Sequence, residues 1–173
     1  MPSIMCTKEL WIELGGAGPL RPRLTLVDGA PRLTAWAAKL VSLPEGFFIV
    51  VVNEETCLTA VIPFVTLDGF PSALAQAVAA ELVVQGVARE QIAVEVASIL
   101  NHTRYSKNSN RSLLGSLNEL CFLFEFELRD LDGVDATSLL EIQHKLNRVP
   151  HSKREPVFAH QAVAELFQDA SAC

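Results

Sequence analysis

Two short apolar runs near the middle of the chain predict a β-hairpin. The first run, 47–52, is apolar at every position, and the second extends over 56–62. Glu54 and Glu55 separate them and are typical of an exposed turn. Because the first run has no polar position, we expect both faces of its strand to be covered, as in the interior of a sheet. Pro63 ends the second run and indicates a strand nearer an edge.

Most of the remaining pattern has a helical period. The clearest helix is predicted over 70–86, where apolar residues recur every fourth position and Gly86 follows the last one. The other predicted helices are a short one after Pro31 carrying Leu33, Trp36, Ala37 and Leu40, then 89–100, 113–128, 139–146 ending before Pro150, and a short one around 163–167.

Two of these segments also fit a strand. Alternate apolar residues occur within 89–100 and again at Phe122, Phe124 and Phe126, and in both segments length favours a helix. Residues 102–107 alternate in polarity and predict a short strand. Since helices outnumber strands, the predicted class is α+β, a single domain over 1–173. Its small antiparallel or mixed sheet has a central hairpin covered by several helices.

Composition and charge exclude several classes of function. Half of the 173 residues are hydrophobic, and 14 Lys and Arg against 20 Asp and Glu give a net charge of -6. An acidic chain is not a general nucleic-acid coating protein or a polybasic membrane binder. No apolar run approaches the roughly 20 residues of a membrane span, and residues 1–10 lack a secretory signal. The expected location is therefore the cytoplasm.

The cysteines and histidines do not form a recognisable metal motif. Cys6, Cys57, Cys121 and Cys173 are scattered, without a C-x-x-C pair or histidines at zinc spacing. Cys57 and Cys121 have apolar neighbours and are expected to be buried. Neither a metal nor a cofactor is predicted, and the common phosphate-loop, dinucleotide-binding, metalloprotease and nucleophile-elbow motifs are absent.

Positive charge is concentrated in two windows that contain no acidic residue. Seven of the fourteen cations lie within 101–118 and 144–154, whereas all 20 acids lie elsewhere. The first window precedes a predicted helix, whose free N–H groups and dipole favour an anion. This arrangement predicts a ligand-binding polar face made by six residues. They are Lys107, Asn110, Arg111, Asn118, Asn147 and Arg148.

Purely structural roles compete with this interpretation. Asn110 can cap the helix that follows it, and basic residues near a helix end, such as Lys145, Lys153 and Arg154, often stabilise its dipole. Gly115 costs a helix about 1 kcal/mol relative to alanine, so close approach of another backbone or of a ligand is expected there.

The blocks K-x-x-N-R-S-x-x-G-S-x-N at 107–118 and L-N-R-x-P at 146–150 carry a family resemblance, together with the hairpin around 53–56 and the segment 6–10. The chain resembles a family of small bacterial proteins catalogued only as a domain of unknown function. The resemblance spans most of the chain. It implies a stand-alone bacterial domain, but it implies no activity and assigns no catalytic residue.

Three functions follow as hypotheses. The favoured one is a non-catalytic binding or interaction module that receives an anionic ligand or an acidic protein partner around Arg111 and Arg148. The alternative is a metal-independent enzyme acting on phosphate esters or nucleic acid, with His102 as general base and Arg104, Lys107 or Arg111 stabilising negative charge. Nucleic-acid binding alone has weaker support because Tyr105 is the one aromatic residue in the basic windows. The apolar helices also leave room for a homodimer.

Overall fold

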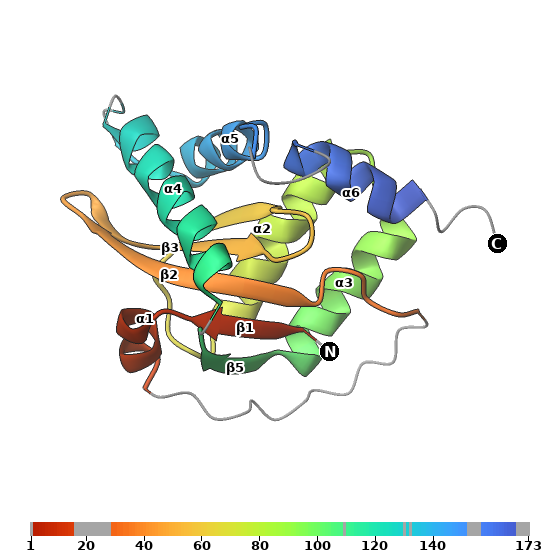
Figure 1. The fold of residues 1–173 in the computed structure, drawn as a ribbon, viewed down its shortest axis with the longest axis horizontal. Coiled ribbons are helices and arrows are strands. Elements are labelled where there is room, and N and C mark those ends of the chain that lie inside the picture. Colours follow the sequence, from red (N-terminus) through yellow and green to blue (C-terminus); the bar gives the residue numbers. More distant parts are fainter. Residues whose placement is uncertain are drawn as a thin grey trace.

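The computed structural model describes residues 2–15, 29–108, 110–129, 131, 133–151 and 157–168. These residues form one sheet with helices on both faces (Figure 1). The elements follow one another as β1 (Ser3–Cys6), α1 (Lys8–Glu13), β2 (Ala35–Leu43), β3 (Gly46–Asn53), β4 (Thr59–Pro63), α2 (Phe70–Val84), α3 (Arg89–His102), β5 (Arg104–Lys107), α4 (Arg111–Leu128), α5 (Ala136–Leu146) and α6 (Ala159–Gln168).

The sheet is mixed and has the strand order β4-β3-β2-β1-β5. Strands β2, β3 and β4 form an antiparallel meander, whereas β1 is parallel to both of its neighbours, β2 and β5. The predicted α+β class, the central hairpin and the edge position of the strand that ends at Pro63 are confirmed.

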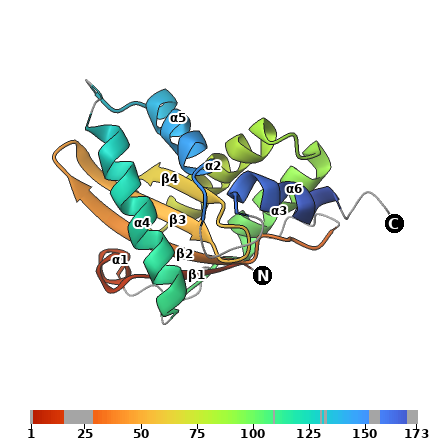
Figure 2. The same ribbon diagram turned by 45° about the horizontal axis from the view of Figure 1, so that its top comes forward.

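Two hydrophobic cores lie on the opposite faces of the sheet. Helices α2, α3 and α6 cover one face, and α4 and α5 cover the other (Figures 1 and 2). Side chains of β3 alternate between the cores: Ile49 and Val51 enter the first, and Phe48, Val50 and Val52 enter the second. Both faces of β3 are therefore covered, as its continuous apolar run predicts.

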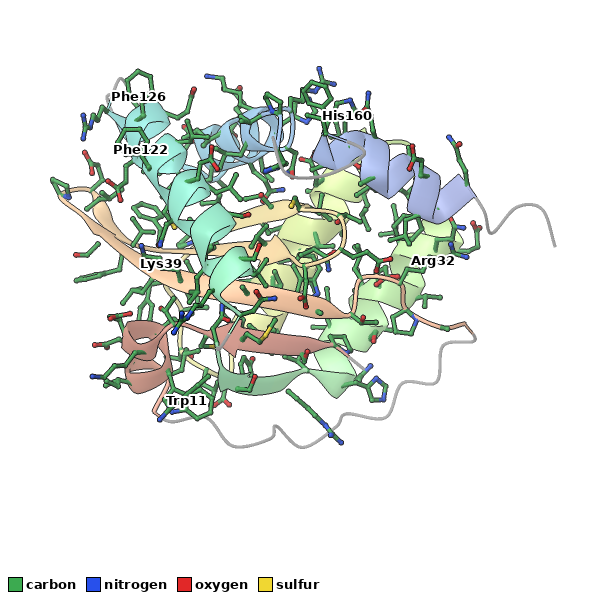
Figure 3. The ribbon with its side chains drawn as sticks, in the orientation of Figure 1. Trp11, Arg32, Lys39, Phe122, Phe126 and His160 are labelled. Atoms are coloured by element: carbon green, nitrogen blue, oxygen red, sulfur yellow. The ribbon has the colours of Figure 1, made fainter. Side chains whose placement is uncertain are left out.

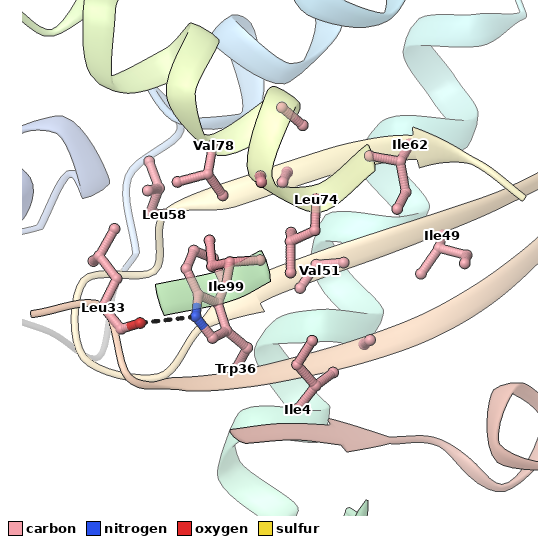
Figure 4. Close-up of a cluster of buried hydrophobic side chains, with 14 of the residues drawn as sticks. Ile4, Leu33, Trp36, Ile49, Val51, Leu58, Ile62, Leu74, Val78 and Ile99 are labelled. Atoms are coloured by element: carbon pink, nitrogen blue, oxygen red, sulfur yellow. Dashed lines mark hydrogen bonds between the residues drawn. The ribbon is translucent and has the colours of Figure 1, made fainter. Parts of the chain in front are cut away.

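The first core is built around Trp36 (Figure 4). This side chain is fully buried, and its indole Nε1 donates a hydrogen bond to the Leu33 carbonyl oxygen at 3.0 Å. Ile4, Val51 and Leu74 belong to the same cluster. The indole therefore buries a large apolar surface while its one donor group is satisfied.

The helix predicted after Pro31 is wrong, because Ala35–Leu43 is strand β2. Trp36 and Ala38 face the first core, whereas Ala37 and Val41 face the second. A segment that is apolar on both faces contains helical spacings by coincidence. This segment pairs with β3 in a register that runs from Trp36–Asn53 to Leu43–Gly46. The pairing makes it a strand although its local spacing fits a helix.

The other predicted elements are confirmed with small shifts of their ends. The five remaining predicted helices correspond to α2, α3, α4, α5 and α6, and the short strand at 102–107 is β5. Neither β1 nor α1 is predicted from the sequence. Lys153, Arg154 and Cys173 lie outside the described residues.

Candidate functional site

A cavity of about 620 Å³ opens beside strand β4, between α2 and the start of α5. Small side chains on α2 make room for it: Ala73, Ala77 and Ala80 share one face of that helix and line the cavity. Leu139 and Leu140 of α5 line the opposite wall. The alanine spacing of four and three residues is the sequence signal that could have indicated this hollow face.

The cavity is apolar inside and acidic at its rim. Among the described residues that line it there is no Lys, Arg or His, and its charged members are Glu45 and Asp135. Asp135 Oδ1 caps α5 by accepting hydrogen bonds from the Ser138 N–H and hydroxyl, both at 2.7 Å. These hydrogen bonds lower the pKa of Asp135 below its ordinary value, so the rim carries negative charge at neutral pH.

Next to the cavity, two side-chain amides close the outer edge of β4: that of Gln143 in α5 and that of Asn147, the C-cap of this helix. Asn147 Oδ1 accepts from the Thr59 N–H at 2.7 Å, and Asn147 Nδ2 donates to the Thr59 carbonyl oxygen at 2.9 Å. Gln143 Oε1 accepts from the Val61 N–H at 3.0 Å. The next outward position is Pro63, which has no N–H. All outward N–H groups of β4 are therefore satisfied or absent.

Helix and strand geometry explain why this pairing works. Four residues of helix rise about 6 Å, and two residues of strand rise about 6.6 Å. Gln143 in α5 and its C-cap Asn147 therefore match Val61 and Thr59 on β4. Gln143 Nε2 also donates to the Ala77 carbonyl oxygen at 2.9 Å, which links α5 to α2.

This geometry removes Asn147 from the polar face expected from the sequence. Its side chain is fully buried, and both polar atoms of its amide bind the backbone, including a bond from Nδ2 to the Gln143 carbonyl oxygen. Arg148, the next residue, is exposed. Within the L-N-R-x-P block, the asparagine thus has a structural role and the arginine faces solvent.

In the first basic window, 101–118, an asparagine again has a structural role and the arginine that follows it is exposed. Asn110 caps α4 by accepting hydrogen bonds from the Ser112 and Leu113 N–H groups, and its Nδ2 donates to Glu54 Oε1 at 2.8 Å. The capping role expected for Asn110 is confirmed, and Arg111 beside it is exposed.

Both windows are attached to the β3–β4 connection. Asn110 binds Glu54 at its beginning, and Asn147 binds Thr59 at its end. Asn53 organises the connection: its Oδ1 accepts from the backbone N–H of Glu55 and Thr56, and its Nδ2 donates to the Ala35 carbonyl oxygen.

Two further predicted residues lie along α4. Asn118 is exposed and its Oδ1 accepts a hydrogen bond from Lys39 Nζ of β2 at 2.7 Å. The expected close approach at Gly115 is wrong for the described chain, because a Cβ atom added there would meet nothing within 4 Å. Lys107 is exposed at the end of β5.

The four residues of the enzyme alternative lie on β5 and on the two helices that flank it in sequence. His102 ends α3 before the strand, and Arg111 begins α4 after it. Alternate strand residues point to opposite faces, so Arg104 and Lys107, three positions apart, leave the strand on different sides. The described structure therefore does not assemble these four residues around one point.

The described residues contain neither a cluster of metal ligands nor a helix that could span a membrane. Within the described ranges, no three His, Cys, Asp or Glu side chains gather closely enough to hold a metal ion. None of the helices described is both long and apolar enough to cross a membrane. Cys6, Cys57 and Cys121 are buried, as the sequence predicts for the latter two.

These features define a single α+β domain with a mixed sheet, a closed β4 edge and one large apolar cavity beside it. The sequence matches the family described as "Domain of unknown function (DUF6933)" over residues 3–162, and the chain belongs to that family. This match confirms the resemblance found in the sequence. No curated protein matches the chain.

Proposed function

We propose that the domain is a non-catalytic binding module, and that the cavity beside β4 is its ligand site. The observation that carries this proposal is the cavity itself, with its volume of about 620 Å³ and its mainly apolar wall. Cavities of roughly 300–1,000 Å³ with apolar walls and a few polar groups are typical of small-molecule sites.

The lining indicates the chemistry of the ligand. An aliphatic or aromatic body would lie between the alanines of α2 and Leu139 and Leu140 of α5. Glu45 and Asp135 at the rim disfavour a carboxylate or phosphate there and favour an uncharged or cationic end. Asp135 contributes this preference over the whole neutral range, because its pKa is lowered.

A fluorescent probe tests the site directly. N-phenyl-1-naphthylamine is apolar and uncharged near neutral pH, and its emission rises when water is excluded. We expect saturable binding to the wild-type protein. Filling the cavity with Ala73→Leu and Ala80→Leu together should weaken this binding by about tenfold or more.

Ala93→Leu is the matched control for each of the two substitutions, because it makes the same change once at an exposed position of α3, away from the cavity. It should leave probe binding unchanged. Equal binding by the wild-type and the filled variant, each shown to be folded by circular dichroism, would overturn the assignment. Native mass spectrometry of gently purified protein is a second readout: a small molecule retained by the wild type should be absent from the filled variant.

The two Asn-Arg pairs support a second candidate function, the anion-receptive face. In each pair the asparagine binds the protein around the β3–β4 connection, and the arginine, Arg111 or Arg148, is exposed. Neither arginine takes part in the ion pairs found among the described residues. Guanidinium groups bind phosphates, carboxylates and acidic protein segments well, and each of these arginines follows an asparagine that is anchored at the connection.

The test uses inorganic phosphate and a polyglutamate peptide as probes. The variant Arg111→Ala with Arg148→Ala should lose their binding, measured by calorimetry, whereas Arg89→Ala with Arg129→Ala changes the net charge equally and should retain it. Equal binding by both double variants would show that the effect is non-specific charge and would exclude the face. Failure of this test leaves the cavity proposal intact, since no residue is shared.

A further inference from the structure

The outer face of α4 carries two exposed aromatic rings. Phe122 and Phe126 are 64% and 55% exposed, and they lie one turn apart on the C-terminal half of the helix (Figure 3). The buried face of α4 is on the opposite side, where Leu113, Leu117 and Phe124 pack on the sheet. The fold of one chain therefore gives these rings no partner surface among the described residues.

Gly115 lies on the same outer face, two turns before Phe122. It is exposed, and the space where its Cβ would be is open. Its backbone is helical, so no left-handed conformation requires glycine there. A glycine in mid-helix is destabilising relative to alanine. Among the described residues, none occupies this flat spot.

The charges along α4 are basic at its start and acidic in its second half. Arg111 begins the helix, the exposed Glu119 and the half-exposed Glu125 follow, and the exposed Arg129 is the C-cap after them. A second α4 in the antiparallel direction would bring the basic start of each helix to the acidic part of the other. A parallel arrangement would instead place like charges side by side.

We propose that two copies of this chain associate through the outer faces of α4, antiparallel and about a twofold axis. In the register that pairs Gly115 with Phe122 of the second copy, Phe122 occupies the flat spot at the glycine. The same register places Arg111 opposite Phe126 and next to Glu125. A guanidinium can then bind the face of one ring and a carboxylate.

A second copy fits this face better than an unrelated partner because the face is self-complementary. The aromatic ring and the glycine lie two turns apart on the same face. A twofold axis between the helices therefore makes the contact between Gly115 and Phe122 twice. Aromatic residues and arginine are also the side chains most enriched at energetically dominant interface positions. This inference is independent of the cavity. It shares Arg111 with the anion-receptive face, since the dimer would cover Arg111 and leave Arg148 exposed.

Sedimentation velocity over low to high micromolar concentrations tests the proposal. The full chain should show a monomer–dimer equilibrium. Phe122→Glu should weaken dimerisation by about thirtyfold or more. Gly115→Leu should also weaken it by blocking the seat of the ring, while the monomer keeps its stability because leucine favours a helix more than glycine does.

Val83→Glu is the matched control, because Val83 is 65% exposed on another helix, α2. It should leave the dimerisation constant unchanged. Charge reversal tests the register: Arg111→Glu and Glu125→Arg should each weaken the dimer, and the two together should restore it. A wild-type chain that stays monomeric would overturn the proposal. A dimer insensitive to Phe122→Glu would place the interface elsewhere, and failure of the double reversal would exclude the antiparallel register.

Discussion

Asn147 forms both outward backbone hydrogen bonds of Thr59, at 2.7 and 2.9 Å, and so takes the place of a neighbouring strand at the edge of the sheet. A side-chain amide carries a donor NH2 group beside an acceptor oxygen, and can therefore reproduce the donor–acceptor pair of a peptide group. The relationship gives a physical reason for an asparagine at this point of the L-N-R-x-P block. It also explains how α5 is held against β4 beside the cavity.

Replacing Asn147 by leucine should destabilise the protein by about 2–4 kcal/mol. The change leaves the N–H and the carbonyl of Thr59 without partners in a buried position, and each unsatisfied group costs about 1–3 kcal/mol. Urea unfolding monitored by circular dichroism measures the loss. Asn118→Leu is the matched control, because it removes a hydrogen bond at an exposed position and should cost less than about 1 kcal/mol. Equal losses in the two variants would contradict the role of Asn147.

Gly115→Ala and Gly86→Ala should change stability in opposite directions. Neither added Cβ meets an atom within 4 Å, so the backbone decides both outcomes. At Gly115, which is helical, alanine should stabilise the monomer by about 0.5–1 kcal/mol. At Gly86, where φ is +76°, alanine should destabilise it by about 1–2 kcal/mol. Urea titrations at low protein concentration, where association does not contribute, should show both signs. A loss of monomer stability in Gly115→Ala would contradict the open environment of that residue.

Glu95 should make stability depend on pH. Its buried carboxylate accepts the backbone N–H groups of Arg32 and Leu33 at 2.6 and 3.3 Å, and burial raises the pKa of Glu95 above its ordinary value despite these bonds. The folded state therefore binds this proton more tightly than the unfolded chain. The resulting contribution of Glu95 to the stability of the folded state is fully present below the ordinary glutamate pKa. It is lost as the pH rises through the raised pKa of the folded state.

Glu95→Gln isolates this effect because glutamine keeps an acceptor oxygen and cannot ionise. The stability of the variant relative to the wild type should increase as the pH is raised from about 4 to about 8. Urea unfolding at several pH values gives the comparison. Glu95→Ala should be destabilised at every pH by about 2 kcal/mol or more, since two N–H groups lose their acceptor. A pH-independent difference between wild type and Glu95→Gln would show that Glu95 does not titrate differently on folding.

The buried thiols should be inert in the folded protein. Burial raises the pKa of Cys6 and of Cys121 to about 12, so neither forms the reactive thiolate near neutral pH. In a Cys173→Ser background, Ellman's reagent at mildly alkaline pH should react very slowly with the native protein and rapidly once urea unfolds it. Fast reaction of the native variant would show that one of these thiols is accessible.

Much of the fold could be predicted because local patterns and tertiary structure agree. The apolar run of β3 and the four-residue repeat of α2 each identify their own element. Strand β2 could not be recognised in the same way, since its two covered faces produce a helical spacing that only long-range pairing with β3 overrides. Strand β1 is short and depends on two partners distant in sequence, so its four residues carry little local signal.

The candidate site was less predictable, because sequence reveals residue types but not where their polar groups are used. Asn110 and Asn147 look alike as polar residues beside arginines, yet Asn147 is fully buried against β4. Arg111 and Arg148 remain predicted members of an anion-receptive face. The cavity depends on α2, β4 and α5 meeting at a particular distance, which no single segment encodes.

The closed edge of β4 has a consequence for misfolding. An exposed strand edge is a template on which other chains add strands and aggregate, and here two amides of α5 and Pro63 remove that template. Local release of α5 would therefore uncover an adhesive edge while the rest of the sheet remained folded. Aggregation through the β4 edge would then depend on how often one helix of eleven residues detaches, rather than on global unfolding.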